Sequence, residues 1–286
     1  MVTENNHFHG MWDDQYYYIP ERKDYNICLG KTSTILPFKN AVINTAKNIH
    51  KSYSNINLFL SGGFDSNVAL LGFLYNQIKP NIKIFKYEDN INLFDVQMSI
   101  AICNKYNLDY EIFNINIKDF LNSQCLQYAS QIFTKDPWFA LLLMITQKHV
   151  NTNSMNIFGI GDFEFKYDRN KKIYFIKERE YLGRLNLICK NYIPFYRYDP
   201  VIMKSWLLDQ QIINFVNDIG FTSDWNKYKS HFYRQHFPEL SDRKKLTGFE
   251  PIQLLFDSFE PKVRKLMDSY NIDKKFLWQD YVNLLS

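Results

Sequence analysis

The order of apolar and polar residues in this 286-residue chain indicates an α/β fold, with helices on both faces of a parallel sheet and a helical C-terminal region. Short apolar runs typical of buried strands alternate with helical patterns between residues 56 and 158. A glycine-rich loop follows the first of these runs directly, as in strand–loop–helix units. After about residue 185 the strand signals fade and the remaining periodic segments are helical.

Each expected element rests on its own run of residues. Strands are predicted where short apolar or alternating runs end at turn residues, at 56–60, 82–87, 110–115 and 155–158. Helices are predicted where apolar residues recur about once per turn, at 37–53, 66–77, 93–106, 117–130 and 137–149. Because parallel strands need crossover connections, these helices are expected to cover the faces of the sheet.

Beyond the sheet, helices are expected at 206–219, at 230–236 and in two stretches between 251 and 286. No linker rich in Gly, Ser or Pro separates this region from the sheet, so we expect it to pack there. The predicted division is an N-terminal extension over 1–50, an α/β domain over 51–185 and a helical region over 186–286.

The composition of the chain indicates which partners and which cellular compartment to expect. The net charge of +4 is spread along the chain, which leaves a nucleic-acid partner open but does not demand one. The four cysteines lie far apart with no C-x-x-C pair, and no signal peptide is visible, which together fit a reducing cytoplasm. No apolar run approaches the ~20 residues of a membrane helix, so no membrane partner is expected.

The first predicted strand leads into a loop suited to phosphate, Ser61-Gly62-Gly63-Phe64-Asp65-Ser66. Two glycines permit tight turns whose backbone N–H groups point into a concavity, and the following helix adds its positive N-terminus. Ser61 and Ser66 can donate hydroxyl hydrogen bonds to phosphate oxygens. Asp65 would repel a bare phosphate, so its presence predicts Mg²⁺. The Walker and dinucleotide-binding patterns are not met, which disfavours an ordinary kinase or a dehydrogenase.

These residues resemble the ATP pyrophosphatases with the signature S-G-G-x-D-S, the PP-loop family. The resemblance implies a Rossmann-like fold of the adenine nucleotide alpha hydrolase type. It also implies that Ser61, Gly62, Gly63, Asp65 and Ser66 bind ATP, which is cleaved to AMP and pyrophosphate as a substrate is adenylated.

Residues 156–167, N-I-F-G-I-G-D-F-E-F-K-Y, are similar to a segment of the asparagine-synthetase branch of that family, G-x-G-x-D-E after a strand. The resemblance places Gly159 and Gly161 in a second nucleotide-binding loop, and Asp162, or Glu164 in its place, beside Asp65 on the metal. The branch often carries a nucleophile-assisting Glu between the glycines, where this chain has Ile160.

Residues 229–234 and 238–251 resemble the late K…R…P…R-x-K-x-G-F segment of the same branch. The branch uses a lysine in this area near the phosphate of the adenylate. Lys229 and Lys245, followed by Arg243, are therefore the catalytic candidates. A cation suits this role because negative charge builds on the α-phosphate and on the departing pyrophosphate.

The resemblance implies a ligase with a small-molecule acid substrate, with ATP and Mg²⁺ as cofactors. Glutamine-dependent members begin with a catalytic cysteine, whereas Val2 follows Met1 here. The amine is therefore expected from free ammonia, a separate ammonia donor or the substrate itself. Two alternatives stay open: adenylation of a nucleobase in tRNA or a deazapurine, and a nucleotide-binding regulatory module with reduced catalysis.

Overall fold

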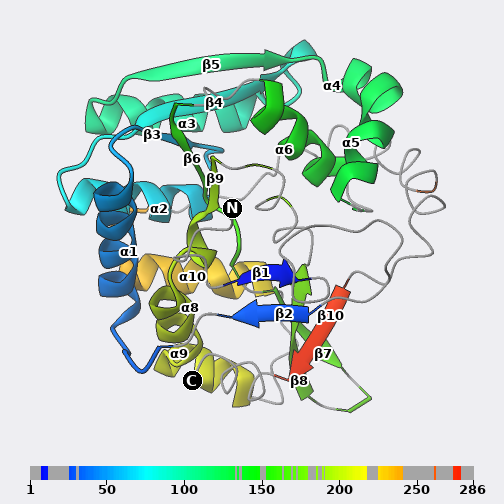
Figure 1. Cartoon of the computed structure of the whole chain (residues 1–286). Helices are drawn as coiled ribbons and strands as arrows, with labels where there is room; N and C mark the ends of the chain where they lie inside the picture. Colours follow the sequence, from blue (N-terminus) through cyan, green and yellow to red (C-terminus); the bar gives the residue numbers. More distant parts are fainter. Residues whose placement is uncertain are drawn as a thin grey trace.

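A five-stranded parallel sheet forms the centre of the protein in a computed structural model (Figure 1). The structure describes residues 8–11, 26–29, 32–132, 134, 137–148, 153–162, 164–168, 170–171, 173–179, 185, 189, 191–217, 225–240, 261 and 273–277. Across the sheet the strands run β5 (Tyr110–Ile115), β4 (Asn81–Tyr87), β3 (Ile56–Phe59), β6 (Met155–Phe158) and β9 (Tyr192–Pro194). Every pairing between these neighbours is parallel.

Alternation along the strands divides the core into two apolar clusters. Leu58 packs into one cluster and its neighbour Phe59 into the other, because successive strand residues point to opposite faces. Ile157 and Phe158 divide in the same way on β6. Phe59 also stacks on Phe158, with ring centroids 4.2 Å apart. Both faces of the sheet are therefore buried, as parallel sheets require.

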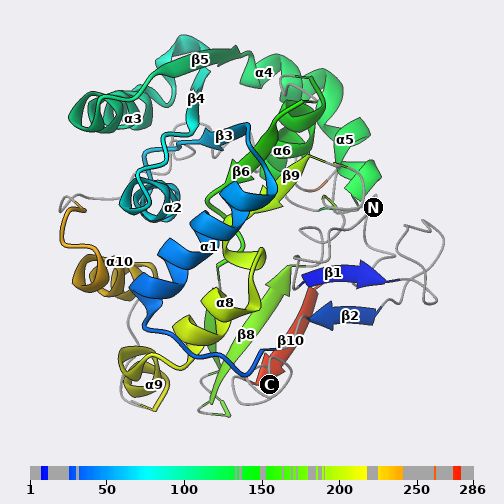
Figure 2. The same ribbon diagram turned by 60° about the vertical axis from the view of Figure 1, so that its left-hand side comes forward.

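Helices cover both faces, which confirms the predicted fold class (Figure 2). The cluster that contains Leu58 takes in α1 (Phe38–Ser52), α2 (Phe64–Tyr75), α3 (Leu93–Tyr106), α8 (Pro200–Leu207), α9 (Gln210–Asn217) and α10 (Trp225–His236). The cluster that contains Phe59 takes in α4 (Ile117–Asp119), the π-helical turn η2 (Phe120–Gln124), α5 (Cys125–Ile132) and α6 (Pro137–Lys148). None of the described helices is long and apolar enough to cross a membrane.

The helices after residue 186 share a core with the first helix of the sheet. Phe38 of α1 lies 5.1 Å from Phe232 and stacks on Tyr233 at 5.8 Å, measured between ring centroids. The described helices α8, α9 and α10 therefore pack in the same apolar cluster as α1. One predicted helix, at 206–219, is in fact two helices. The first begins early because the Asp199 side chain accepts from Val201 N at 2.8 Å and Pro200 occupies the first turn.

Several of the described strands were not predicted from the sequence. A three-stranded antiparallel sheet joins β7 (Glu164–Asp168), β8 (Ile173–Arg179) and β10 (Asp273–Leu277), and β1 (Phe8–Met11) pairs with β2 (Asn26–Leu29). The helical expectation was wrong at β10, because its backbone pairs with the distant β8, a choice that local periodicity does not register. The fifth strand of the parallel sheet, β9, is drawn from the segment 186–286. The three-part division of the chain stays a prediction.

Candidate nucleotide and metal site

Two loops meet at the carboxyl edge of the sheet, where the strand order reverses. The loop after β3 leads into α2, and the loop after β6 begins at Gly159. The two strands are neighbours, with Phe59 paired to Phe158. Since β4 and β5 lie on one side of β3 and β6 and β9 on the other, the loops flank the topological switch point. Open α/β sheets bind ligands in the crevice at this point.

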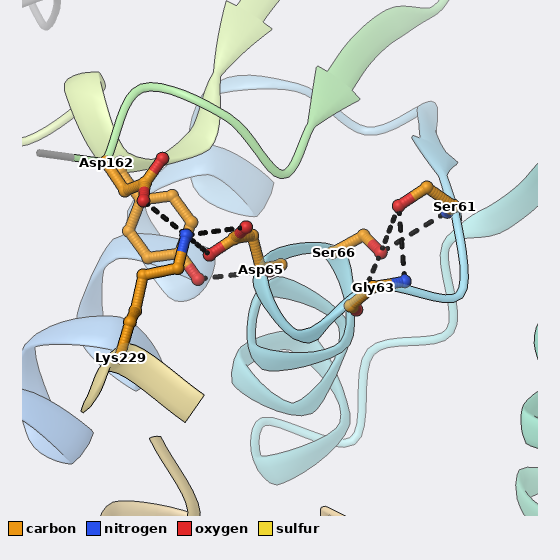
Figure 3. Close-up of polar contacts among 7 residues, drawn as sticks. Ser61, Gly63, Asp65, Ser66, Asp162 and Lys229 are labelled. Atoms are coloured by element: carbon orange, nitrogen blue, oxygen red, sulfur yellow. Dashed lines mark hydrogen bonds and ion pairs between the residues drawn. The ribbon is translucent and has the colours of Figure 1, made fainter. Parts of the chain in front are cut away.

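Hydroxyl groups brace the first loop from within (Figure 3). The Ser66 hydroxyl donates to Gly63 O at 3.2 Å and lies 3.1 Å from the Ser61 hydroxyl. The backbone N–H of Gly63 donates to Ser61 Oγ at 3.3 Å. The loop therefore holds its curvature through its own residues, at the N-terminus of the 12-residue helix α2.

Gly62 is needed for both conformation and space. Its φ is +71°, in the left-handed region that favours glycine. A Cβ at this position would lie 2.7 Å from the backbone oxygen of Asp95 on α3. The first loop therefore lies directly against the start of α3, and an alanine would push the two apart.

The second loop lies against the first. A Cβ at Gly159 would come within 2.4 Å of Ser66 Cα, so the missing side chain lets the loop after β6 touch the start of α2. Gly161 has a φ of +95°, and its carbonyl accepts from Arg197 Nε at 2.6 Å. Arg197 is buried. Both glycines thus set the path of this loop, while their predicted contact with a nucleotide stays a prediction.

Asp65, Asp162 and Lys229 form an ion cluster between the two loops, hereafter the ion triad (Figure 3). Lys229 Nζ, from α10, donates to Asp162 Oδ2 at 2.6 Å and to Asp65 Oδ2 at 3.0 Å. It also lies 2.9 Å from Asp65 Oδ1. Lys229 is only 6% exposed, so this ammonium has little access to water.

Opposing effects act on the charge of Lys229. Burial by itself would lower the pKa of the ammonium, but Asp162 and Asp65, by charge and hydrogen bonding, outweigh burial and raise the pKa above its ordinary value. Lys229 is therefore cationic at neutral pH. With two carboxylates and one ammonium, the ion triad carries a net charge of about −1.

Two tyrosines support the ion triad and were not found in the sequence analysis. The Tyr196 hydroxyl donates to the backbone oxygen of Asp65 at 3.0 Å, and its ring stacks on Tyr233 at 6.3 Å between centroids. Lys229 Nζ lies 5.8 Å from the centroid of the Tyr233 ring. Burial raises the pKa of both phenols well above the usual range, so both stay protonated. The available signal was spacing, because Tyr233 lies one helical turn after Lys229.

The structure brings together most of the predicted site residues. Those that meet at the two loops are Ser61, Gly62, Gly63, Asp65, Ser66, Gly159, Gly161, Asp162 and Lys229. The backbone of Glu164 opens β7, paired with Lys177, which makes it part of the antiparallel sheet. Arg243 and Lys245 fall outside the described residues. The roles assigned to all of these residues stay predictions.

The side chain of Ile160 contacts apolar residues of the core. Its side chain is partly buried against the apolar cluster that contains Phe59 and Phe158. Its backbone N–H donates to Phe158 O at 2.8 Å, and its carbonyl accepts from Tyr196 N at 3.3 Å. The position where the resemblance expects a nucleophile-assisting Glu therefore belongs to the core.

The donor set suits a cation that also binds phosphate. Within the described part of the chain, no group of three or more His, Cys, Asp or Glu gathers to hold a metal. Asp65 and Asp162 nevertheless converge closely enough to contact one ammonium. Mg²⁺ is commonly held by one or two carboxylates together with substrate phosphates, so two converging aspartates beside a phosphate-type loop fit this ion.

Comparison with known proteins yields remote structural similarities. No family model and no curated protein matches the chain. Among solved structures it is similar to an NH3-dependent NAD synthetase from Campylobacter jejuni, with 16% identity over 82% of this chain and 94% of that one, and a TM-score of 0.32. It is also similar to an NMN synthetase from Francisella tularensis, with 12% identity over 77% and 92%, and a TM-score of 0.31. At such low TM-scores, the fold and the proposed chemistry rest on the sheet and side chains described above.

Proposed function

We propose that the chain is an adenylating ligase of the ATP pyrophosphatase type, which cleaves ATP to AMP and pyrophosphate. The observation that carries the proposal is the ion triad beside the loop of residues 61–66, at the switch point of a parallel sheet. A phosphate-type loop, two carboxylates and a buried lysine are the groups that such a reaction requires.

Each group has a separate task in this proposal. The backbone N–H groups of residues 61–66 bind the phosphates of ATP at the start of α2. Asp65 and Asp162 would hold Mg²⁺, which would neutralise charge on the phosphates. Lys229 offsets the charge that builds on the α-phosphate and on the leaving pyrophosphate. The reaction itself puts AMP on a substrate oxygen.

The finer assignment is amide formation of the asparagine-synthetase type, on a small-molecule acid, with ammonia or a substrate amine as nucleophile. It is supported by the sequence resemblance of residues 156–167 and 229–251. Cys103 and Cys189 are free thiols, which suits a reducing compartment, and we place the reaction in the cytoplasm.

The test is exchange of labelled pyrophosphate into ATP by the purified chain, across a panel of carboxylic acids. Exchange is expected to require Mg²⁺ and one acid. Lys229→Met is expected to lower it about a hundredfold, because the cation that offsets the developing charge is lost.

Lys204→Met is the matched control for this test. Lys204 is also a buried lysine, but its ammonium donates to Thr32 O at 2.7 Å and lies outside the ion triad. The control should keep its exchange rate. An equal loss in the two variants would mean that Lys229 acts on folding and not on the reaction.

A second candidate is a nucleotide-binding regulatory module without the ligase step. It is favoured by Ile160, which packs against the apolar cluster where the resemblance expects an acid. The same experiment separates the two candidates, since binding of ATP without exchange on any acid would favour the module.

A further inference from the structure

Lys229 occupies the place that a shared metal would need. Its ammonium contacts both Asp65 and Asp162, at 2.6 to 3.0 Å from three of their oxygens. The lysine reaches this position from α10, far along the chain from both aspartates (Figure 3). The contact is thus a product of the fold and is built around the same two carboxylates that the proposed function assigns to Mg²⁺.

A metal ion and the ammonium compete for the three oxygens that Lys229 contacts. Mg²⁺ binds carboxylate oxygens at about 2.0–2.1 Å, so an ion bridging the two aspartates would lie in contact with Lys229 Nζ. Two cations in contact with so little water between them repel strongly, because burial weakens screening. The ammonium and the metal therefore compete for the pair: the ammonium offsets one of its two charges, and a divalent metal would offset both.

Binding of a nucleotide would favour release of the Lys229 ammonium from Asp65 and Asp162. A triphosphate bound at residues 61–66 brings several negative charges close to the ion triad and offers the ammonium new partners. The lysine side chain is flexible and can exchange one anionic partner for another without moving its helix. The aspartates would then be free to accept the metal that accompanies the phosphates.

We propose that Lys229 is a tethered cation that excludes divalent metal from the Asp65–Asp162 pair until nucleotide phosphates draw it away. The inference rests on the proposed function, in that Asp65 and Asp162 are taken as the metal ligands. Its consequence is an order of binding in which metal enters with the nucleotide and not before it. Without a metal, the resting site keeps the Lys229 ammonium as its cation.

The test is binding of Mn²⁺ alone, without nucleotide, measured by titration calorimetry on the full chain. The wild type is expected to bind Mn²⁺ weakly. Lys229→Met should bind it on the order of tenfold more tightly or better, because the competing charge is gone. Mn²⁺ should also raise the melting temperature of Lys229→Met more than that of the wild type.

Two further variants locate the effect. Lys204→Met removes a buried lysine elsewhere and should bind Mn²⁺ like the wild type. Lys229→Met combined with Asp162→Asn should lose the gain, because one metal ligand is removed. If Lys229→Met does not fold, Lys229→Gln carries the same comparison, since its amide can still donate to one carboxylate.

Equal Mn²⁺ affinity in the wild type and Lys229→Met would overturn the proposal. So would failure of both Lys229 variants to fold even with Mn²⁺ present, since the metal would then be unable to replace the ammonium. Folding that is restored by Mn²⁺ would support it. Because no nucleotide is used, a positive result here stands even if pyrophosphate exchange fails, and a negative result leaves the exchange experiment untouched.

Discussion

The two parts of the candidate site, the loop of residues 61–66 and the ion triad, differ in the sequence separation of the residues that they join. In the first loop, hydrogen bonds join residues two to five positions apart. In the ion triad, Lys229 reaches Asp162 across 67 positions and Asp65 across 164. A local contact leaves a local pattern of residue types, whereas a distant one leaves none. The loop could therefore be predicted from six consecutive residues, whereas the contact of Lys229 with both aspartates is visible only in the fold.

Gly159 offers the strongest way to test this contrast, because it is where the two parts touch. Gly159→Ala would place a Cβ 2.4 Å from Ser66 Cα and 2.6 Å from Ser66 N, both backbone atoms that have little room to move. We expect the free energy of unfolding, measured in urea, to fall by about 3 kcal/mol.

Gly63→Ala is the control for that change. Its φ of −75° is open to any residue, and its Cβ would meet only the Ser61 hydroxyl, at 3.3 Å. The expected loss is under about 1 kcal/mol, the difference between glycine and alanine at a helix N-cap. Similar losses in the two variants would contradict the close approach of the loops.

Asp162→Asn tests the long-range part alone. It keeps the shape of the side chain but leaves Lys229, whose side chain is 8% exposed, with Asp65 as its remaining carboxylate. We expect the free energy of unfolding to fall by about 2 kcal/mol, because the buried ammonium of Lys229 loses one of its two carboxylate partners.

An exposed ion pair provides the comparison. The Asp89 and Lys118 side chains are 64% and 57% exposed, so Asp89→Asn should leave stability unchanged within error. If Asp162→Asn also left the free energy of unfolding unchanged, the ion triad would not hold the two loops together.

Ser66→Ala probes the local part and has the smallest expected effect. The buried Ser66 hydroxyl donates to Gly63 O and contacts the Ser61 hydroxyl, so its loss should cost about 1 kcal/mol in urea unfolding. Ser123→Ala, at an exposed hydroxyl bonded to Asp119 O, should change stability by less than about 0.5 kcal/mol. A larger loss from Ser66→Ala than from Asp162→Asn would show that the local hydrogen bonds of the loop stabilise the protein more than the ion triad does.

Much of the fold could be anticipated because its strands are short, apolar and bounded by turns. The four predicted strands and the helices between them lie close to their expected positions. β9 was missed because three residues carry no periodicity, and β10 because its pairing with β8 is remote in sequence. Tyr196 was missed for a similar reason, since its bond to Asp65 O joins residues 131 positions apart.

The chain's residue pattern alone determined that a parallel sheet would form, and that residues 61–66 would make a glycine-rich turn ahead of a helix. Those outcomes follow from steric freedom at glycine and from apolar periodicity, which act over a few residues. Only the tertiary structure decided that Lys229 would stand between Asp65 and Asp162. Charge pairing at such separation depends on where packed helices bring side chains, and the core that packs α10 against α1 and α2 sets that position.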